Sequence, residues 1–158
     1  MLDRAQSSAK VAVKLAHLPH DFPAIAAIRV AVFQVEQGVD KALEFDGKDN
    51  EAVHFLAYLG DRPVGTARIR FLDSTTAKLE RLAVLADARG SGIGKQIMSQ
   101  AIAFLREESI SEIRIHAQEP VKEFYERLGF AAEGDRFYEA SIPHLKMSKQ
   151  LGSIGGRR

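Results

Sequence analysis

A glycine-rich stretch between a strand-like run and a helix-like run constrains this chain more than any other feature. The stretch reads Arg89-Gly90-Ser91-Gly92-Ile93-Gly94-Lys95. Residues 78–84 before it look like a strand, and after it apolar residues recur from Ile93 to Leu105 at the spacing of one helix face. The first turn of such a helix offers unpaired N–H groups and the positive end of its dipole. The stretch therefore predicts a loop that cradles a pyrophosphate or a similar anion.

The spacing of the glycines separates three known phosphate-binding patterns. A Walker loop would need glycine at Arg89 and a hydroxyl at Gln96, so that pattern fails twice. The dinucleotide fingerprint fails because its third glycine comes one residue early and because residues 85–89 follow the strand. The pattern Arg/Gln-x-x-Gly-x-Gly/Ala is matched by Arg89, Gly92 and Gly94. This match resembles the acyl-CoA loop of the GCN5-related N-acetyltransferase (GNAT) superfamily, although a glycine-rich helix start that binds no ligand can look the same.

The residues on both sides of the loop extend this resemblance over most of the chain. Residues 113–118 alternate like a strand, residues 120–128 look like a short helix, and the string Phe124 to Phe130 (F-Y-E-R-L-G-F) resembles the closing motif of the superfamily. Residues 80–84 resemble its fourth strand. Residues 32–38 and 142–147 resemble the small bacterial ElaA-like branch. The resemblance implies an α/β (α+β) fold with a mixed, mostly antiparallel sheet, one parallel strand pair splayed at the coenzyme A site, and helices on both faces.

The order of the predicted elements agrees with such a fold. An edge strand is expected at residues 11–16, followed by a helix at 22–35 that Asp21 caps. The long connection 37–50, which contains Asp40, Glu44, Asp46 and Asp49, is either a binding loop or part of a second helix. Further strands are expected at residues 52–59, 64–71, 77–84, 113–118, 135–140 and 142–149. The strand at 113–118 follows a helix of about 16 residues, as a parallel crossover requires.

Length and composition predict one domain over residues 1–151, with a loose lead-in at 1–10 and a flexible tail at 152–158. The 158 residues include 46% hydrophobic and 27% charged residues, which is ordinary for a globular protein. A formal net charge of +1 argues against nucleic-acid binding, and no apolar run reaches the about 18 residues of a membrane span. The absence of cysteine excludes an acyl-cysteine intermediate and suits the cytoplasm. The five histidines lack metal-site spacing, so we expect no metal, and a monomer or homodimer.

The resemblance also implies a set of residues that bind acetyl-CoA, the expected acyl donor. The backbone of Leu82, Ala83 and Val84 would bind pantetheine, and an N–H near Ala83 or Val84 would serve the oxyanion. The loop amides would hold the pyrophosphate, with help from the Arg89 and Lys95 side chains. The cofactor-binding set is completed by Phe124, Tyr125 and Gln118, and its loop members are Gly90, Ser91, Gly92, Ile93, Gly94 and Lys95. Gln118 could instead be a solvated residue at a strand end.

Three residues are candidates for the proton transfers. Tyr125 matches the superfamily tyrosine that protonates the departing thiolate, unless it is only a packed aromatic residue. Glu80 is our first choice as the base, because strict alternation puts it on one face with Leu82 and Val84; Lys78 or Arg81 could instead simply pair with it. His116 is the second choice, because an unperturbed imidazole suits a base at neutral pH, although a lone histidine on a strand is more often structural. The resemblance to the ElaA-like branch further implies a substrate pocket that includes Glu36, His54, Glu139 and His144, although the sequence does not orient these side chains.

These expectations define one preferred function and one alternative. The preferred function is an N-acetyltransferase that moves an acetyl group from acetyl-CoA to a primary amine of a small molecule or peptide, by direct attack in a ternary complex. The alternative is a non-catalytic acyl-CoA-binding or sensor domain on the same fold. The sequence does not identify the amine.

Overall fold

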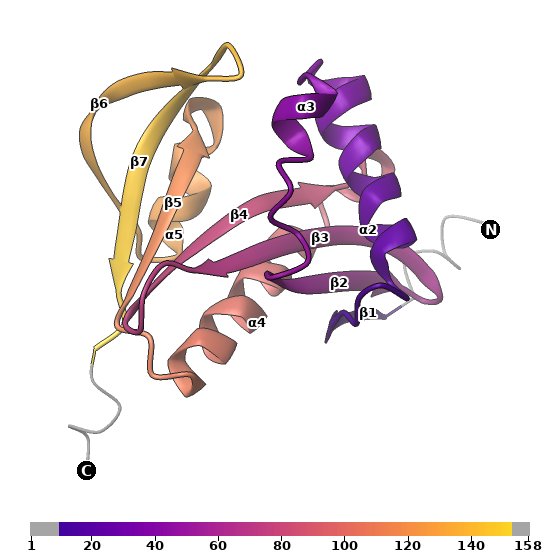
Figure 1. The fold of residues 1–158 in the computed structure, drawn as a ribbon, viewed down its shortest axis with the longest axis horizontal. Coiled ribbons are helices and arrows are strands. Elements are labelled where there is room, and N and C mark those ends of the chain that lie inside the picture. Colours follow the sequence, from indigo (N-terminus) through magenta and orange to yellow (C-terminus); the bar gives the residue numbers. More distant parts are fainter. Residues whose placement is uncertain (1–9, 153–158) are drawn as a thin grey trace. The chain divides into compact units, whose positions relative to one another are not determined.

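The structure, a computed structural model, describes residues 10–152 and is built from seven strands and several short and long helices (Figure 1). The predicted lead-in and tail therefore lie almost wholly outside the described residues. In chain order the elements are β1 (Val11–Leu15), α2 (Phe22–Arg29), η1 (Val30–Glu36), α3 (Lys41–Glu44), β2 (Val53–Leu59), β3 (Arg62–Phe71), β4 (Thr76–Val84), η2 (Ala86–Ala88), α4 (Ile93–Glu107), β5 (Glu112–Gln118), η3 (Glu119–Val121), α5 (Lys122–Arg127), β6 (Ala131–Glu139) and β7 (Ile142–Gln150).

The strands form a mixed sheet in the order β1-β2-β3-β4-β5-β7-β6. The pairs β1–β2, β5–β7 and β6–β7 are antiparallel. Only two residues connect β2 to β3, and so short a connection joins antiparallel strands. The pair β4–β5 is parallel, with Thr76 opposite Glu112 and Lys78 opposite Arg114. Both strands continue beyond this short register, β4 to Val84 and β5 to Gln118, so the predicted mixed sheet with one parallel pair is confirmed.

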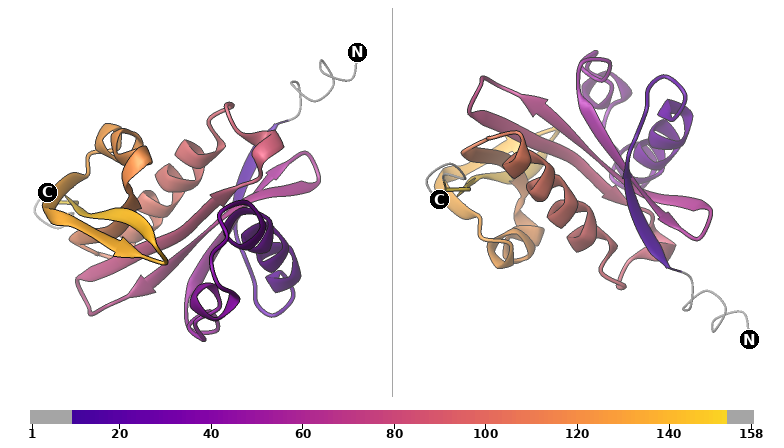
Figure 2. Two further views of the ribbon diagram at one scale, coloured as in Figure 1. Left: turned by 90° about the horizontal axis from the view of Figure 1, so that it is seen from above. Right: turned by 90° about the horizontal axis from the view of Figure 1, so that it is seen from below.

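The chain divides into two compact units, which are described separately. Within the described residues, the first unit comprises 10–68 and 81–101. Its core joins apolar residues of α2 and η1 to the sheet: Ile25, Ile28, Val32, Phe33, Leu56 and Ala83. On the other face of β3, a Cβ at Gly65 would lie only 2.8 Å from Ile97 Cδ1, so glycine lets α4 approach closely. Helices therefore cover both faces of this part of the sheet, as predicted (Figure 2).

The second unit comprises, among the described residues, 69–80 and 102–152. Alternation along β5 buries Ile113, Ile115 and Ala117. The side chains of the intervening residues Arg114, His116 and Gln118 lie on the opposite face of β5. In register with them on β7 are Ser148, Lys146 and His144. One face of this part of the sheet is therefore apolar core, and the other is a polar surface.

Two elements differ from the sequence predictions. The α-helix expected at 22–35 is α-helical only to Arg29 and continues as a π-helix over Val30–Glu36. Asp21 occupies the N-cap position, but its carboxylate accepts the His17 N–H at 2.7 Å and caps no helical amide. Strand β6 begins at Ala131, earlier than the predicted residue 135, because pairing with β7 forms it although its exposed residues show no alternating pattern.

In residues 10–152, no helix combines the length and apolar character that a membrane crossing requires.

Candidate active site

The predicted anion loop lies at the start of α4, where the sequence placed it. Gly90 and Gly92 have φ values of +91° and +82°, in the left-handed region that favours glycine. An added Cβ at either position would meet no heavy atom within 4 Å, so the space beside both glycines is open. Ile93 and Ile97 are buried and anchor the first turns of the helix. The first amides of α4 have no acceptor inside the helix and remain available to an anion.

Arg89 connects the loop to two other segments of the first unit. Its Nε donates to the carbonyl of Val84, at the end of β4, at 2.9 Å. Its other two nitrogens donate to the Glu36 carboxylate at 2.5 and 2.6 Å. This hydrogen bonding lowers the pKa of Glu36 and raises that of Arg89. The side chain that we expected on the pyrophosphate therefore pairs with Glu36, a predicted pocket residue, and organises the loop.

Strand β4 contains an irregularity that the sequence prediction missed. Arg81 has a φ of +59°, which a residue other than glycine rarely adopts. Arg81 donates a hydrogen bond to the carbonyl of Glu44, and Ala83 packs in the core beneath α2. Both side chains therefore lie on the same face of β4. Leu82 and Val84, both half-buried, leave the other face. The positive φ of Arg81 interrupts the regular strand geometry between Glu80 and Leu82, so the alternation that put Glu80 on one face with Leu82 and Val84 loses its support.

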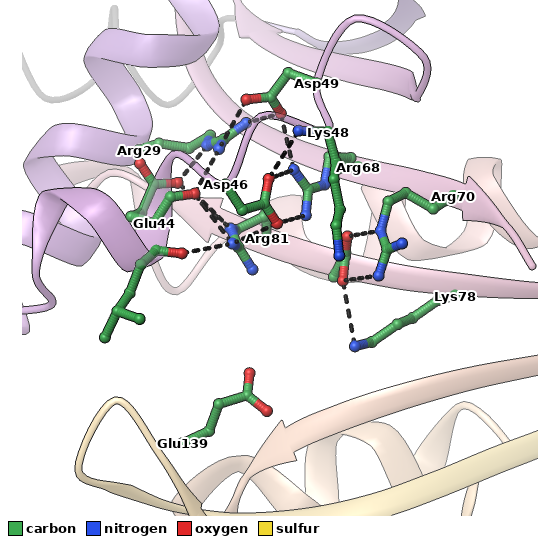
Figure 3. A network of polar contacts seen from close by, with 12 residues as sticks. Arg29, Glu44, Asp46, Lys48, Asp49, Arg68, Arg70, Lys78, Arg81 and Glu139 are labelled. Atoms are coloured by element: carbon green, nitrogen blue, oxygen red, sulfur yellow. Dashed lines mark hydrogen bonds and ion pairs between the residues drawn. The ribbon is translucent and has the colours of Figure 1, made fainter.

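A buried network of charged side chains holds the connection 37–50 in the first unit (Figure 3). Arg29 Nε donates to Glu44 Oε2 at 2.5 Å and its Nη1 to Asp49 Oδ1 at 2.7 Å. Arg68 donates to Asp46 at 2.9 and 2.8 Å and to Asp49 at 3.0 Å. The acidic residues of this connection were noticed in the sequence, but their three arginine partners were not, since Arg29, Arg68 and Arg81 come from three separate elements.

His54 belongs to this network and not to an open pocket. It is 1% exposed, and its Nε2 lies 2.9 Å from the Asp49 carbonyl oxygen. Burial lowers the pKa of His54, against the opposing effect of Asp49. Neither His54 Nδ1 nor Glu44 Oε1, both buried, has a hydrogen-bond partner. The position of His54 gives its predicted pocket role no support and indicates a neutral core imidazole.

In the second unit, Tyr125 lies on the short helix α5 within an aromatic group. Its ring meets Phe124 edge-on at a centroid distance of 5.0 Å and Phe130 at 6.0 Å. Burial raises the pKa of Tyr125 to about 12. The phenol is therefore neutral at physiological pH and can donate its proton in a hydrogen bond. Its packing fits both the catalytic and the purely structural alternative.

Glu80, our first choice as the base, is held by two cations of the second unit, Arg70 and Lys78. Arg70 Nε donates to its carboxylate at 2.6 Å, and the Lys78 ammonium lies 3.5 Å from its other oxygen. Arg70 was not among the predicted site residues, because only the pairing of β3 with β4 brings it to Glu80. Both oxygens of the Glu80 carboxylate are thus engaged by cations.

His116, the second choice, has a different environment on the polar face of the second unit. Its Nδ1 lies 2.9 Å from Glu139 Oε1. The ring of Phe137 meets His116 edge-on at 5.0 Å and stacks on His144 at 5.8 Å. Hydrogen bonding by His116 outweighs burial and lowers the pKa of Glu139. Fold topology thus brings together His116, Glu139 and His144, which the sequence had placed in two separate predicted sets.

The arrangement can be summarised by unit. The first unit carries Leu82, Ala83, Val84, the loop 89–95, Glu36 and His54, and the second carries Glu80, His116, Gln118, Phe124, Tyr125, Glu139 and His144. Within the described residues, no group of three or more histidine, aspartate or glutamate side chains is placed to hold a metal ion.

The sheet topology, the interrupted strand β4 and the glycine loop that opens α4 together define an acyl-CoA N-acyltransferase fold. Residues 20–151 match the acetyltransferase (GNAT) domain family, and the chain belongs to that family. The predicted family resemblance is thereby confirmed, and the protein is an acyltransferase.

Individual relatives agree with this assignment. A Bacillus subtilis protein, named provisionally as an acetyltransferase, is 40% identical over 126 residues, which cover 78% of this chain and 85% of that protein. The uncharacterized N-acetyltransferase YjcF of Bacillus subtilis is 36% identical over 123 residues, covering 77% of this chain and 87% of YjcF. The crystal structure of Escherichia coli ElaA superposes with a TM-score of 0.80 at 26% identity, covering 89% of this chain and 99% of ElaA.

Proposed function

We propose that this protein transfers an acetyl group from acetyl-CoA to a primary amine of a small molecule or peptide, by direct attack in a ternary complex. The observation that carries the proposal is the loop at the start of α4. Two glycines with positive φ and open space beside them precede the free amides of a helix that runs for 15 residues. These features suit the pyrophosphate of a coenzyme A thioester.

In the proposed complex, the loop amides bind the pyrophosphate, and backbone groups of Leu82, Ala83 and Val84 bind pantetheine. Arg89 acts indirectly, since its bonds to Val84 and Glu36 hold the loop in shape. An N–H of Ala83 or Val84 would stabilise the oxyanion that forms at the thioester carbonyl. Binding at these groups orients the thioester for attack by a neutral amine.

Tyr125 is proposed to assist the departure of coenzyme A. When the carbon–sulfur bond breaks, the thiolate needs a proton or a strong hydrogen-bond donor. A phenol whose pKa is raised to about 12 remains protonated and can donate a hydrogen bond to the thiolate at neutral pH. The proton that the amine loses goes to a separate base.

Acetyl-CoA binding by the loop is tested with two glycine positions. Gly92→Asp places an anion in the proposed cradle and should abolish the thermal shift that acetyl-CoA causes in the wild type. At a ligand concentration of about 100 times Kd, that shift should correspond to about 2.7 kcal/mol. Gly60 is a matched control because it has a φ of +65° and open space but lies in the β2–β3 turn. Gly60→Asp should cost similar stability and leave the shift intact.

Turnover is tested separately, with a panel of amines and detection of free coenzyme A by a thiol reagent. Release that depends on the amine supports transfer and identifies the acceptor class. Binding of acetyl-CoA without release by any amine would instead indicate the non-catalytic sensor. An equal thermal shift for wild type and Gly92→Asp would contradict the role of the loop.

A further inference from the structure

The polar face of the second unit contains a histidine that is oriented by a carboxylate. His116 Nδ1 and Glu139 Oε1 are 2.9 Å apart, and the two side chains are 28% and 46% exposed. With the Nδ1 proton donated to Glu139, the lone pair of Nε2 is left to accept a proton. Nothing in the described part of the chain bonds to Nε2. The edge contact of Phe137 restricts the ring from a second direction.

Residues on three strands give this pair its position. His116 alternates with the buried Ile115 and Ala117, so its ring lies on the polar face of β5. Glu139 lies at the end of β6, where it pairs with Ile142 of β7. Phe137, two residues before Glu139, stacks on His144, whose Nδ1 lies 2.7 Å from the Ile142 carbonyl oxygen. The orientation of His116 is thus built into the sheet and does not depend on a loop.

The other charged groups of this surface have roles that differ from that of His116. Lys78 and His144 both act on the Glu139 carboxylate through their charge, and Lys146 lies opposite His116 in the β5–β7 register. Glu80 shares the Lys78 side of β4 but is bonded to Arg70. Within the described residues, Nε2 of His116 bonds to no other group, whereas the carboxylate of Glu80 is engaged by two cations. The geometry therefore favours His116 over Glu80.

We infer that His116 is the general base of the proposed acetyl transfer and that Glu139 is the positioning residue that holds its ring and its tautomer. This inference rests on the proposed function. As the amine nitrogen bonds to the thioester carbonyl carbon, Nε2 of His116 takes one proton from that nitrogen. The carbon–sulfur bond then breaks, and coenzyme A leaves as a thiolate that is protonated by water or by Tyr125, which in that case regains its proton from solvent. The products are the amide and the free thiol, and His116 later returns its proton to solvent.

The pH profile of kcat/KM separates this role from a structural one. Glu139→Gln removes the anion beside the imidazolium that forms in the reaction, so the acidic limb should move to lower pH. The value of kcat should also fall, while acetyl-CoA binding remains unchanged. His116→Asn should remove the limb, so that the rate follows the ionisation of the amine itself.

Two variants are matched controls. Glu133→Gln makes the same change on β6, where Glu133 accepts only the Ser148 hydroxyl at 2.8 Å, and should leave the profile unchanged. Glu80→Gln should keep the acidic limb even if it lowers stability. An unchanged profile in Glu139→Gln, or loss of the limb in Glu80→Gln, overturns the inference while acetyl-CoA turnover by the wild type still supports the function. Absence of turnover in a wild type that binds acetyl-CoA overturns both.

Discussion

Tyr125 shows how one side chain can fit two roles until its effect on rate is measured. The ring packs between Phe124 and Phe130, which would suffice for a structural residue. Its hydroxyl is the part that catalysis would use, and replacing tyrosine by phenylalanine removes that group alone. The raised pKa keeps the phenol protonated over the whole range in which such enzymes are assayed.

Tyr125→Phe should lower kcat by about 10²-fold, the usual size of general acid catalysis, with little change in acetyl-CoA affinity. The reason is that a hydroxyl used only when the thiolate leaves contributes to the transition state and not to the ground state. Steady-state kinetics and a binding titration measure the two quantities. A variant with wild-type kcat would show that Tyr125 is a packing residue.

At the scale of elements, strand β4 departs from regular geometry at Arg81. The left-handed backbone there is unfavourable for a residue with a Cβ, by about 1–2 kcal/mol. The Arg81 side chain offsets this cost, because it bonds the carbonyls of Leu43 and Glu44 and the carboxylate of Asp46. The irregular strand and the acidic connection therefore stabilise each other.

Arg81→Gly and Arg81→Ala should separate the backbone cost from the side-chain contacts. Both variants lose the contacts, but only glycine adopts a positive φ without strain, so Arg81→Gly should be the more stable by about 1 kcal/mol. Chemical denaturation measures the difference. At Lys14 of β1, where the backbone is an ordinary strand, the order should reverse. Equal stability of the two Arg81 variants would mean that the backbone relaxes.

At the scale of the whole molecule, the buried charges make folding sensitive to acid. Hydrogen bonds from Arg68 hold the pKa of Asp46 well below its ordinary value. Burial raises the pKa of Asp49. The hydrogen bonds and charges of Arg29 and Arg68 together lower this pKa by more than burial raises it, so the net shift is downward. Burial depresses the pKa of His54. In each case the unfolded chain binds a proton more readily than the folded protein.

The free energy of unfolding should therefore fall in two stages as the pH is lowered. The first stage begins near pH 6.5, where His54 is protonated only in the unfolded chain, and the second below about pH 4, where the same applies to Asp46 and Asp49. The carboxylate contribution is present above pH 4 and is lost as the pH falls through the folded values. Denaturation curves at a series of pH values measure both stages.

Asp46→Asn should lower stability at neutral pH by about 2 kcal/mol, because it removes a carboxylate from the buried guanidinium of Arg68, and should flatten the second stage. Asp87→Asn is the matched control, since Asp87 pairs with Arg62 on the surface and should contribute little. Equal effects of the two substitutions would contradict the importance of burial.

The sequence by itself determined the elements whose signals are local. The glycine loop, the apolar face of α4, the alternating strand β5 and the order of strands and helices were all predicted, because periodicity, helix termini and turn residues act within a few neighbours. The same local order carried the resemblance to the GNAT family and the choice of the loop, Tyr125, Glu80 and His116 as candidates.

Only the tertiary structure decided which charged groups meet. Glu80 pairs with Arg70 across two strands, His116 with Glu139 at a separation of 23 residues, and Arg29 with Glu44 and Asp49 at 15 and 20 residues. These pairings depend on strand register and on which elements the fold brings together, and a shift of one residue would turn every later side chain of a strand to the other face. Alternation read from the sequence does not show which residues of other strands lie opposite, so the partners of Glu80 and of His116 came from the fold.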